Sequence, residues 1–396
     1  MNMNEQMKES EESILHTYNR FPVVFEKGQG CYLYDSEGKE YLDFAAGIAV
    51  NSLGYHYPGY DEALKDQIDK LMHISNLYYN EPIIEAGAKL VKASKMSKAF
   101  FTNSGTEAIE GALKAAKKYA YVRDGHADHE IIAMNHSFHG RSIGALSVTG
   151  TAHYREPFEP LMGGVKFADF NDLESVKAQI TDKTCAIITE VVQGEGGIYP
   201  AKKEFLEGLR QICDEKDIML IFDEIQCGMG RTGHYFAWQA YGVQPDIMTS
   251  AKALGCGVPV GAFVLNEKAA KASLEPGDHG TTYGGNPFVC AAVSKVFDIY
   301  ENDKIIEHVQ EMTPYLEQKL DEIVAKHECA VTRRGMGFMQ GIVIQGRPVG
   351  EVVKAALAKG LLVISAGSDV LRIVPPLVIT KEHIDKMAAI LDECME

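Results

Sequence analysis

Three polar segments follow apolar, strand-like runs in positions where they could act on a bound ligand. Asp223 ends one run, Lys252 follows a second, and TNSGTEA (102–108) follows a third. Ligands of open α/β sheets bind beyond the carboxyl ends of the strands, so we expect these groups to converge. For Asp223 alone, a structural salt bridge or a helix cap remains the simpler explanation, because an unpaired buried carboxylate is costly.

The segment 102–108 has the features of an anion site at a helix start. Ser104 and Glu107 have capping-box spacing, which predicts that a helix begins here. The free N–H groups of a first helical turn, the close approach allowed by Gly105 and the hydroxyl of Thr106 could together hold a phosphate. An ordinary helix cap would explain the two capping residues equally well.

Together these groups match the functional groups of one cofactor. Pyridoxal phosphate offers a phosphate, a ring nitrogen and an aldehyde. The helix start could hold the phosphate, Asp223 could pair with the ring nitrogen and Lys252 could bind the aldehyde. In NHSFHGRS (135–142), Phe138 could cover a flat ring and Arg141 could bind a carboxylate.

A competing interpretation rests on GMGRTG (228–233), which has the dinucleotide-binding pattern G-x-G-x-x-G. That fold needs the pattern directly between a strand and a helix, with an acidic residue about 20 positions on. Here five residues, 223–227, separate the strand from the glycines, and no clear helical pattern follows Gly233. Asp246 lies at a suitable distance, so a nicotinamide-dependent dehydrogenase stays as a remote alternative.

Composition narrows the class of protein and its partners. The 396 residues carry 39 Lys and Arg against 55 Asp and Glu, a net charge of −16, which argues against binding to nucleic acid or anionic membranes. The eight cysteines are scattered without a C-x-x-C pair, and the N-terminus lacks a signal-peptide pattern. We predict a cytoplasmic protein. No further ligands accompany His136 and His139, so we predict no metal site.

The pattern of apolar runs predicts the elements that position these groups. Short runs with little polar alternation are separated by helical patterns, which favours an α/β fold with a mainly parallel sheet covered on both faces. The strand-like runs are 98–102, 130–134, 185–192, 218–222 and 246–250, and the helical patterns are 81–94, 106–120 and 203–216. The segment 31–44 reads as a hairpin, and 288–327 as long helix, followed by a smaller α+β pattern.

The chain resembles the class III (ω-) aminotransferases of fold type I, and within them the acetylornithine aminotransferases. The resemblance covers nearly the whole length, through NSGTEA, SFHGRS, EVVQGEGG, IFDEIQCGMGRTG, SAKALGCGVPVGA, HGTTYGGNP and LRIVPPLVIT. It implies a large domain (55–287) with a seven-stranded sheet, and a small domain (288–396) joined by the N-terminal segment (1–54). It also implies that the glycine-rich turn binds no dinucleotide.

The resemblance further implies a role for each matching residue. Lys252 would hold pyridoxal phosphate as a Schiff base, and Asp223 would keep the ring nitrogen protonated. The other cofactor contacts would come from Gly105, Thr106, Phe138, Gln226 and, across the interface of a homodimer, Thr282. N-Acetylornithine and 2-oxoglutarate would be the substrates, bound by Arg141, Thr281, Tyr18 and Arg372, with Glu195 neutralising Arg372 while the ω-amino donor is bound.

Three positions depart from the usual family pattern. Val191, Ile109 and Ser142 stand where proline, asparagine and threonine are common. None of these changes removes a catalytic group, so the type of reaction is unaffected. They leave the identity of the amino donor open. Ornithine, succinylornithine or 4-aminobutyrate could replace N-acetylornithine, and a semialdehyde aminomutase is also compatible with the pattern.

Overall fold

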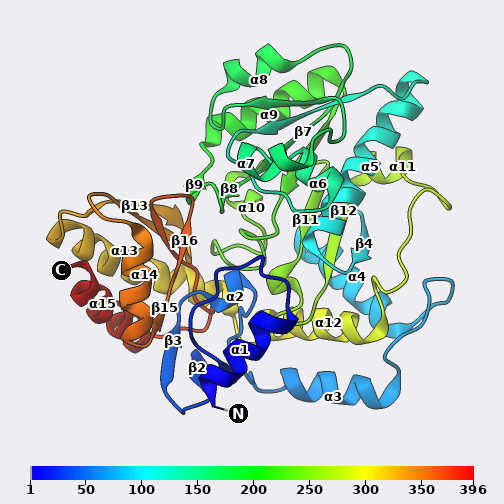
Figure 1. The fold of residues 1–396 in the computed structure, drawn as a ribbon. Helices are drawn as coiled ribbons and strands as arrows, with labels where there is room; N and C mark the ends of the chain where they lie inside the picture. The colour runs from blue at the N-terminus through cyan, green and yellow to red at the C-terminus, as the bar shows by residue number, and fades with distance from the viewer. Residues whose placement is uncertain (1) are drawn as a thin grey trace.

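In the computed structural model, which describes residues 2–396, a seven-stranded sheet forms the centre of the larger part of the molecule (Figure 1). Its order is β4 (Lys98–Thr102), β12 (Gly261–Leu265), β11 (Ile247–Ser250), β10 (Met219–Asp223), β7 (Thr184–Glu190), β5 (Glu130–Met134) and β6 (Val165–Ala168). β12 runs antiparallel to both neighbours, and all other pairs are parallel. The predicted α/β fold with a mainly parallel seven-stranded sheet is confirmed.

The central strands are buried on both faces, which explains why they lack polar alternation. All five residues of β10 are buried. Leu220 and Phe222 enter one hydrophobic cluster, while Met219 and Ile221 enter a second cluster on the other face. α5 (Gly105–Asp124) packs on the second face, and α4 (Glu81–Ser94) and α9 (Lys203–Lys216) contact strands of the same sheet.

The smaller part contains a four-stranded antiparallel sheet, in the order β13 (Ala330–Met336), β14 (Met339–Ile344), β17 (Val370–Ile373) and β16 (Ile364–Ala366). α13 (Ile305–Lys326) and α14 (Val349–Ala358) contact this sheet, and α15 (Lys381–Met395) packs against both of these helices. In the N-terminal sheet, β1 (Phe25–Gln29), β2 (Tyr32–Asp35) and β3 (Glu40–Asp43) form an antiparallel meander, and β3 pairs in parallel with β15 (Leu361–Leu362). We propose that the domains are 1–54, 55–287 and 288–396.

Most expected elements are present, with two kinds of difference. The single long helical pattern is broken into α12 (Pro287–Asn302) and α13, because Lys304 between them adopts φ 53°. β1, β6, β12 and β13 were not expected from the sequence pattern. The other elements are α1 (Met3–Ser13), α2 (Ala46–Ala49), α3 (Tyr60–Lys70), α6 (Ile143–Ser147), α7 (Ala152–Arg155), α8 (Leu173–Gln179), α10 (Trp238–Tyr241), α11 (Glu267–Ala272), β8 (Val192–Gln193) and β9 (Tyr199–Pro200).

α2 is a left-handed turn close to the carboxyl edge of the central sheet. Ala46, Gly47, Ile48 and Ala49 have φ between 48° and 64°. Left-handed backbone costs roughly 1–2 kcal/mol for each residue that is not glycine. Asp43 compensates by accepting the N–H groups of Ala45 (2.9 Å) and Ala46 (2.8 Å). Strain of this kind is typical of segments that border functional sites.

Within residues 2–396, no helix has the length and apolar character needed to cross a membrane.

Candidate active site

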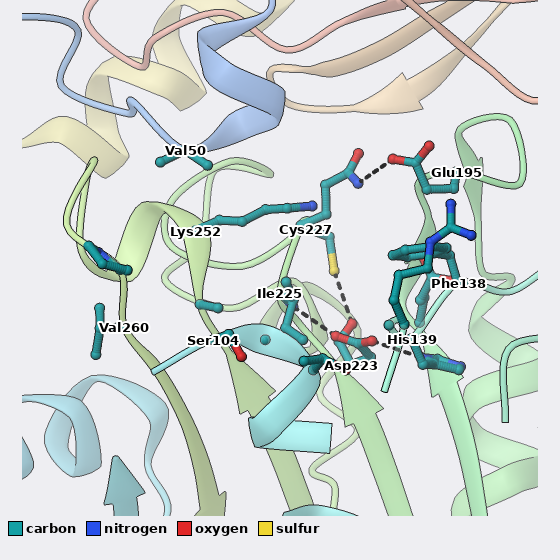
Figure 2. A pocket seen from close by; sticks show the side chains of 18 of the residues that line it. Val50, Ser104, Phe138, His139, Glu195, Asp223, Ile225, Cys227, Lys252 and Val260 are labelled. Atoms are coloured by element: carbon teal, nitrogen blue, oxygen red, sulfur yellow. Dashed lines mark hydrogen bonds and ion pairs between the residues drawn. The ribbon is translucent and has the colours of Figure 1, made fainter. Parts of the chain in front are cut away.

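A cavity of about 440 Å³ lies at the carboxyl edge of the central sheet. Ser104, Phe138, Glu190, Asp223 and Lys252 line it, each at or just beyond the end of a different strand: β4, β5, β7, β10 and β11. Figure 2 shows the side chain of Lys252 extending into this cavity above Asp223. Phe138, Asp223 and Lys252 were predicted at the site from the sequence, and Ser104 was predicted as the cap of the adjoining helix.

Lys252 is half-buried, extends into the cavity and adopts an unusual backbone conformation. Burial lowers the pKa of its ammonium group, and the nearby guanidinium of Arg372 acts in the same direction. Its φ of 49° places it in the left-handed region, which is uncommon for a lysine and holds the side chain away from the path of β11. A lysine with a lowered pKa keeps more of its amine neutral, as a nucleophile or a general base requires.

Asp223 is held by three partners at the end of β10. Nδ1 of His139 lies 2.7 Å from one carboxylate oxygen, and the other oxygen accepts the hydroxyl of Thr249 (3.1 Å) and the N–H of Ile225 (3.0 Å). Both Asp223 and His139 are buried. The carboxylate is thus fixed in direction and could hold a cationic ring nitrogen in the cavity.

The first turn of α5 can bind an anion. Ser104 is the N-cap and accepts the N–H of Glu107 (3.3 Å), which leaves the N–H groups of Gly105 and Thr106 available. The hydroxyl of Thr106 lies 2.7 Å from that of Ser142. A side chain at Gly105 would meet Ile225 at 2.9 Å, so glycine also permits the close packing of this turn against β10.

Phe138 and Arg141 line another side of the cavity, and Arg141 also contacts the ring of Tyr154. The guanidinium of Arg141 lies 3.8 Å from the ring centre of Tyr154 and 5.3 Å from that of Phe138. Arg141 is exposed at the cavity mouth, where it could meet a substrate carboxylate. Figure 2 shows Phe138 and Ile225 on opposite sides of the Asp223 carboxylate, as expected for residues that enclose a flat ring.

Glu195 and Arg372 form a paired charge beside the lysine. The guanidinium donates to both carboxylate oxygens, with Nη2 at 3.3 Å from Oε2 and Nη1 in contact with Oε1. Nη1 also donates to Oε1 of Gln226 (3.1 Å), and Nη2 to the carbonyl of Ser365 (3.1 Å). The guanidinium holds the pKa of Glu195 below its usual value, against the opposing effect of burial.

Glu190 is a second buried carboxyl group in the same cavity. It ends β7 in register with Asp223 on β10. Burial raises its pKa to about 7, and the charge of Asp223 acts in the same direction. It accepts the N–H of Phe138 (3.0 Å) and that of Gly194 (2.8 Å).

Four predicted site residues do not line this cavity. Arg372 lines a neighbouring pocket, from which it reaches Glu195. Thr281 is half-buried and accepts the side-chain amide of Asn103 (3.2 Å), at the rim of the site. Thr282 is exposed, and Tyr18 is 71% exposed on the N-terminal segment. Within one chain these residues therefore lie outside the pocket.

Sequence reasoning missed His139 and Glu190 as parts of the site. Glu190 ends an apolar run as Asp223 does, so the same criterion would have found it. His139 follows Phe138 directly and was considered only as a metal ligand. Its contact with Asp223 spans 84 residues and has no local signal.

The glycine-rich turn has a structural role. No helix of more than four residues follows it before β11. Asp246, the acid that a dinucleotide site would need, accepts the N–H of Leu220 (2.8 Å) and pairs with Arg210 (2.9 Å). Arg231 within the turn is buried and donates to the carbonyl of Pro375. Asp246 and Arg231 are thus engaged in structural contacts, so the sequence features that suggested a dehydrogenase do not form a dinucleotide site.

A separate cluster contains Asp124, His126 and His129 at the end of α5. Arg123 pairs with Asp124, and the two imidazole rings are stacked with centres 4.5 Å apart and planes 18° from parallel. Nε2 of the buried His129 lies 3.0 Å from the carboxylate of Asp124, so the same carboxylate is paired with both His129 and Arg123.

A family model described as aminotransferase class-III matches residues 14–395. An acetylornithine aminotransferase of Clostridium acetobutylicum is 47% identical over 388 residues, covering 98% of this chain and 100% of that protein. A succinylornithine transaminase of Yersinia pseudotuberculosis is 44% identical over 385 residues, covering 94% of this chain and 92% of that protein.

Solved structures show the same fold. The ornithine aminotransferase of Toxoplasma gondii superimposes with a TM-score of 0.95 at 28% identity, covering 99% of this chain and 94% of that one. That structure is described as having partial occupancy of pyridoxal phosphate at its active site.

Proposed function

Because this chain belongs to the class III aminotransferases, we propose that it transfers the terminal amino group of N-acetylornithine to 2-oxoglutarate. The products are N-acetylglutamate 5-semialdehyde and glutamate, a step of arginine biosynthesis. The observation that carries this proposal is the Glu195–Arg372 pair beside Lys252. One substrate places a carboxylate beside Arg372, and the other does not. The site therefore needs a carboxylate of its own that can pair with Arg372 and then give way to the substrate.

The residues of the cavity fit pyridoxal phosphate, the cofactor of this family. The turn at Gly105 and Thr106 would hold the phosphate, Phe138 would cover the ring, and Asp223 would pair with the ring nitrogen. Nε2 of His139 is buried without a partner among residues 2–396, which leaves it free to meet a group bound in the cavity. When bound, the cofactor supplies an electron sink that makes the donor carbon acidic.

Lys252 provides the base. Burial lowers the pKa of its Nζ. The neutral amine would take the proton from the amine-bearing carbon of the donor and deliver it to the bound cofactor. The carboxylate of Asp223 would stabilise positive charge at the ring nitrogen, while His139 and Thr249 hold its orientation.

The substrate carboxylates would be bound by two arginines. Arg141, supported by Thr281 and Tyr18, binds the α-carboxylate of N-acetylornithine. Arg372 binds the α-carboxylate of 2-oxoglutarate after Glu195 has moved away. A bidentate guanidinium suits both carboxylates, because it offers two parallel N–H donors.

The active protein would be a homodimer that completes its site across the interface. The connection between α3 and α4 exposes an apolar surface, with Leu77 86%, Tyr78 65% and Tyr79 95% exposed, and Tyr283 beside Thr282 is 62% exposed. A monomer rarely leaves such a group of large apolar side chains in water. Thr282, exposed in a single chain, would reach the phosphate bound by the partner.

We place the enzyme in the cytoplasm. The support is that all eight cysteines are free thiols, as a reducing compartment would keep them.

A donor panel tests this function. N-Acetylornithine, N-succinylornithine, ornithine and 4-aminobutyrate are compared by kcat/KM at saturating 2-oxoglutarate. N-Acetylornithine should give the highest value, and succinylornithine is the main competitor because a relative carries that name. A tenfold preference for another donor would reassign the substrate, and turnover without 2-oxoglutarate would indicate an aminomutase.

A further inference from the structure

Two buried carboxyl groups stand side by side at the centre of the cavity, and only one of them has been given a role. Glu190 and Asp223 are the last residues of adjacent parallel strands and are paired in register. Residues in register on parallel strands project to the same face of the sheet. Both are buried and both line the cavity.

Glu190 connects two loops that have different tasks. One of its oxygens accepts the N–H of Phe138, and the other accepts the N–H of Gly194, at 3.0 and 2.8 Å. Phe138 is the residue that covers the ring and is followed by His139, which orients Asp223. Gly194 is followed by Glu195, the partner of Arg372.

The second loop fits closely against the site. A side chain at Gly194 would meet the amide of Gln226 at 2.6 Å, so the backbone lies against that residue. Gln226 contacts Glu195 (3.4 Å) and accepts from Arg372 (3.1 Å). A displacement of Gly194 would therefore move the groups that bind the two substrates in turn.

We infer that Glu190 is a positioning residue, which rests on the proposed function and deepens it: its carboxyl group holds the ring-covering loop and the Glu195 loop at a fixed separation. The same residue thus controls cofactor binding and the balance between the two half-reactions. It acts through Phe138 and Glu195 rather than by touching the reacting atoms.

The chain contains a matched control in Glu224. Glu224 is also buried, follows a strand of the same sheet, and accepts two backbone N–H groups, those of Ala237 and Trp238, both at 2.8 Å. Burial raises the pKa of Glu224 to about 7, as it does for Glu190. Glu224 does not line the cavity. Loss of fold stability alone should therefore be similar in the two glutamine variants.

The experiment compares Glu190→Gln and Glu224→Gln with the wild type. The amide oxygen of glutamine can accept one of the two backbone N–H groups. Its NH2 group is a donor, so it cannot form a hydrogen bond with the other N–H. We expect similar falls in melting temperature. Only Glu190→Gln should weaken pyridoxal phosphate binding by about tenfold and lower the donor half-reaction about tenfold relative to the 2-oxoglutarate half-reaction. Tenfold corresponds to about 1.4 kcal/mol, close to one lost hydrogen bond to a charged group.

Glu190→Asp provides a second route if the glutamine variant does not fold. It keeps the charge but is too short to reach both N–H groups, so it should change the same two quantities. Equal effects of the Glu190 and Glu224 variants on cofactor affinity and on the ratio of half-reactions would overturn the inference. A wild type that transaminates no ω-amine would refute the proposed function instead, while the cofactor affinities would still decide the role of Glu190.

Discussion

Replacing Glu195 with alanine should separate the two half-reactions. Arg372 is 3% exposed, and its other contacts among residues 2–396 are with neutral oxygens of Gln226 and Ser365. Without Glu195, the guanidinium has no counter-charge while N-acetylornithine is bound. When 2-oxoglutarate or glutamate is bound, the substrate carboxylate supplies that charge. The variant should therefore lose activity with the ω-amine and gain activity with α-amines such as glutamate.

The structure allows the size of this effect to be worked out. Removing one partner of a buried ion pair costs about 3–5 kcal/mol. The side chain of Glu195 is 26% exposed, so water can partly replace it, and we take the lower value. About 3 kcal/mol corresponds to roughly a hundredfold in rate. The ratio of the glutamate rate to the N-acetylornithine rate should rise by about that factor.

Single-turnover absorbance measurements on each half-reaction would test this prediction. Asp246→Asn serves as the control, because it breaks the buried pair of Asp246 with Arg210 (2.9 Å) away from the cavity. The control should lower the melting temperature without changing the ratio. If Glu195→Ala instead slows both half-reactions equally and lowers the melting temperature, the pair is a permanent bridge between domains and the reasoning is refuted.

Three further changes probe the other groups. Lys252→Ala should abolish turnover with little change in melting temperature, and normal turnover with a borohydride-reducible link to the cofactor would contradict this. Asp223→Asn should keep some cofactor but lose about 4 kcal/mol of transition-state stabilisation, roughly a thousandfold in kcat, whereas a near-normal kcat would make the carboxylate structural. Burial raises the pKa of Glu224 to about 7 from the usual 4.5, so the folded protein binds this proton more tightly than the unfolded chain. The contribution of Glu224 to the free energy of unfolding therefore falls as pH rises from 4.5 to 7. Denaturant titrations should accordingly show that the wild type is most stable relative to Glu224→Gln at pH 4.5 and least stable above pH 7. A difference that stays constant would show that Glu224 does not titrate in this range.

Much of the architecture could be predicted because its signals are local. A strand buried on both faces is apolar at nearly every position, so 130–134 and 218–222 were recognisable as strands from sequence alone. The run 98–102 was also recognisable, although it forms the partly exposed edge strand β4. β12 was not expected, although all of its residues are buried. Parallel strands are marked in the sequence by the helical pattern that precedes each of them. β12 follows β11 after a short connection and lacks that signal. It lies between β4 and β11 and runs antiparallel to both.

The sequence by itself determined which chemical groups stand at strand ends: a carboxylate at Asp223, an amine at Lys252 and a helix start at Gly105. Only the tertiary structure decided what these groups face. The partners of Arg372 and Asp223 lie 177 and 84 residues away, at Glu195 and His139. Local residue types specify elements because backbone propensity and burial act over a few positions. The charge of a buried group, in contrast, depends on whichever distant groups the packed sheet brings within a few ångströms of it.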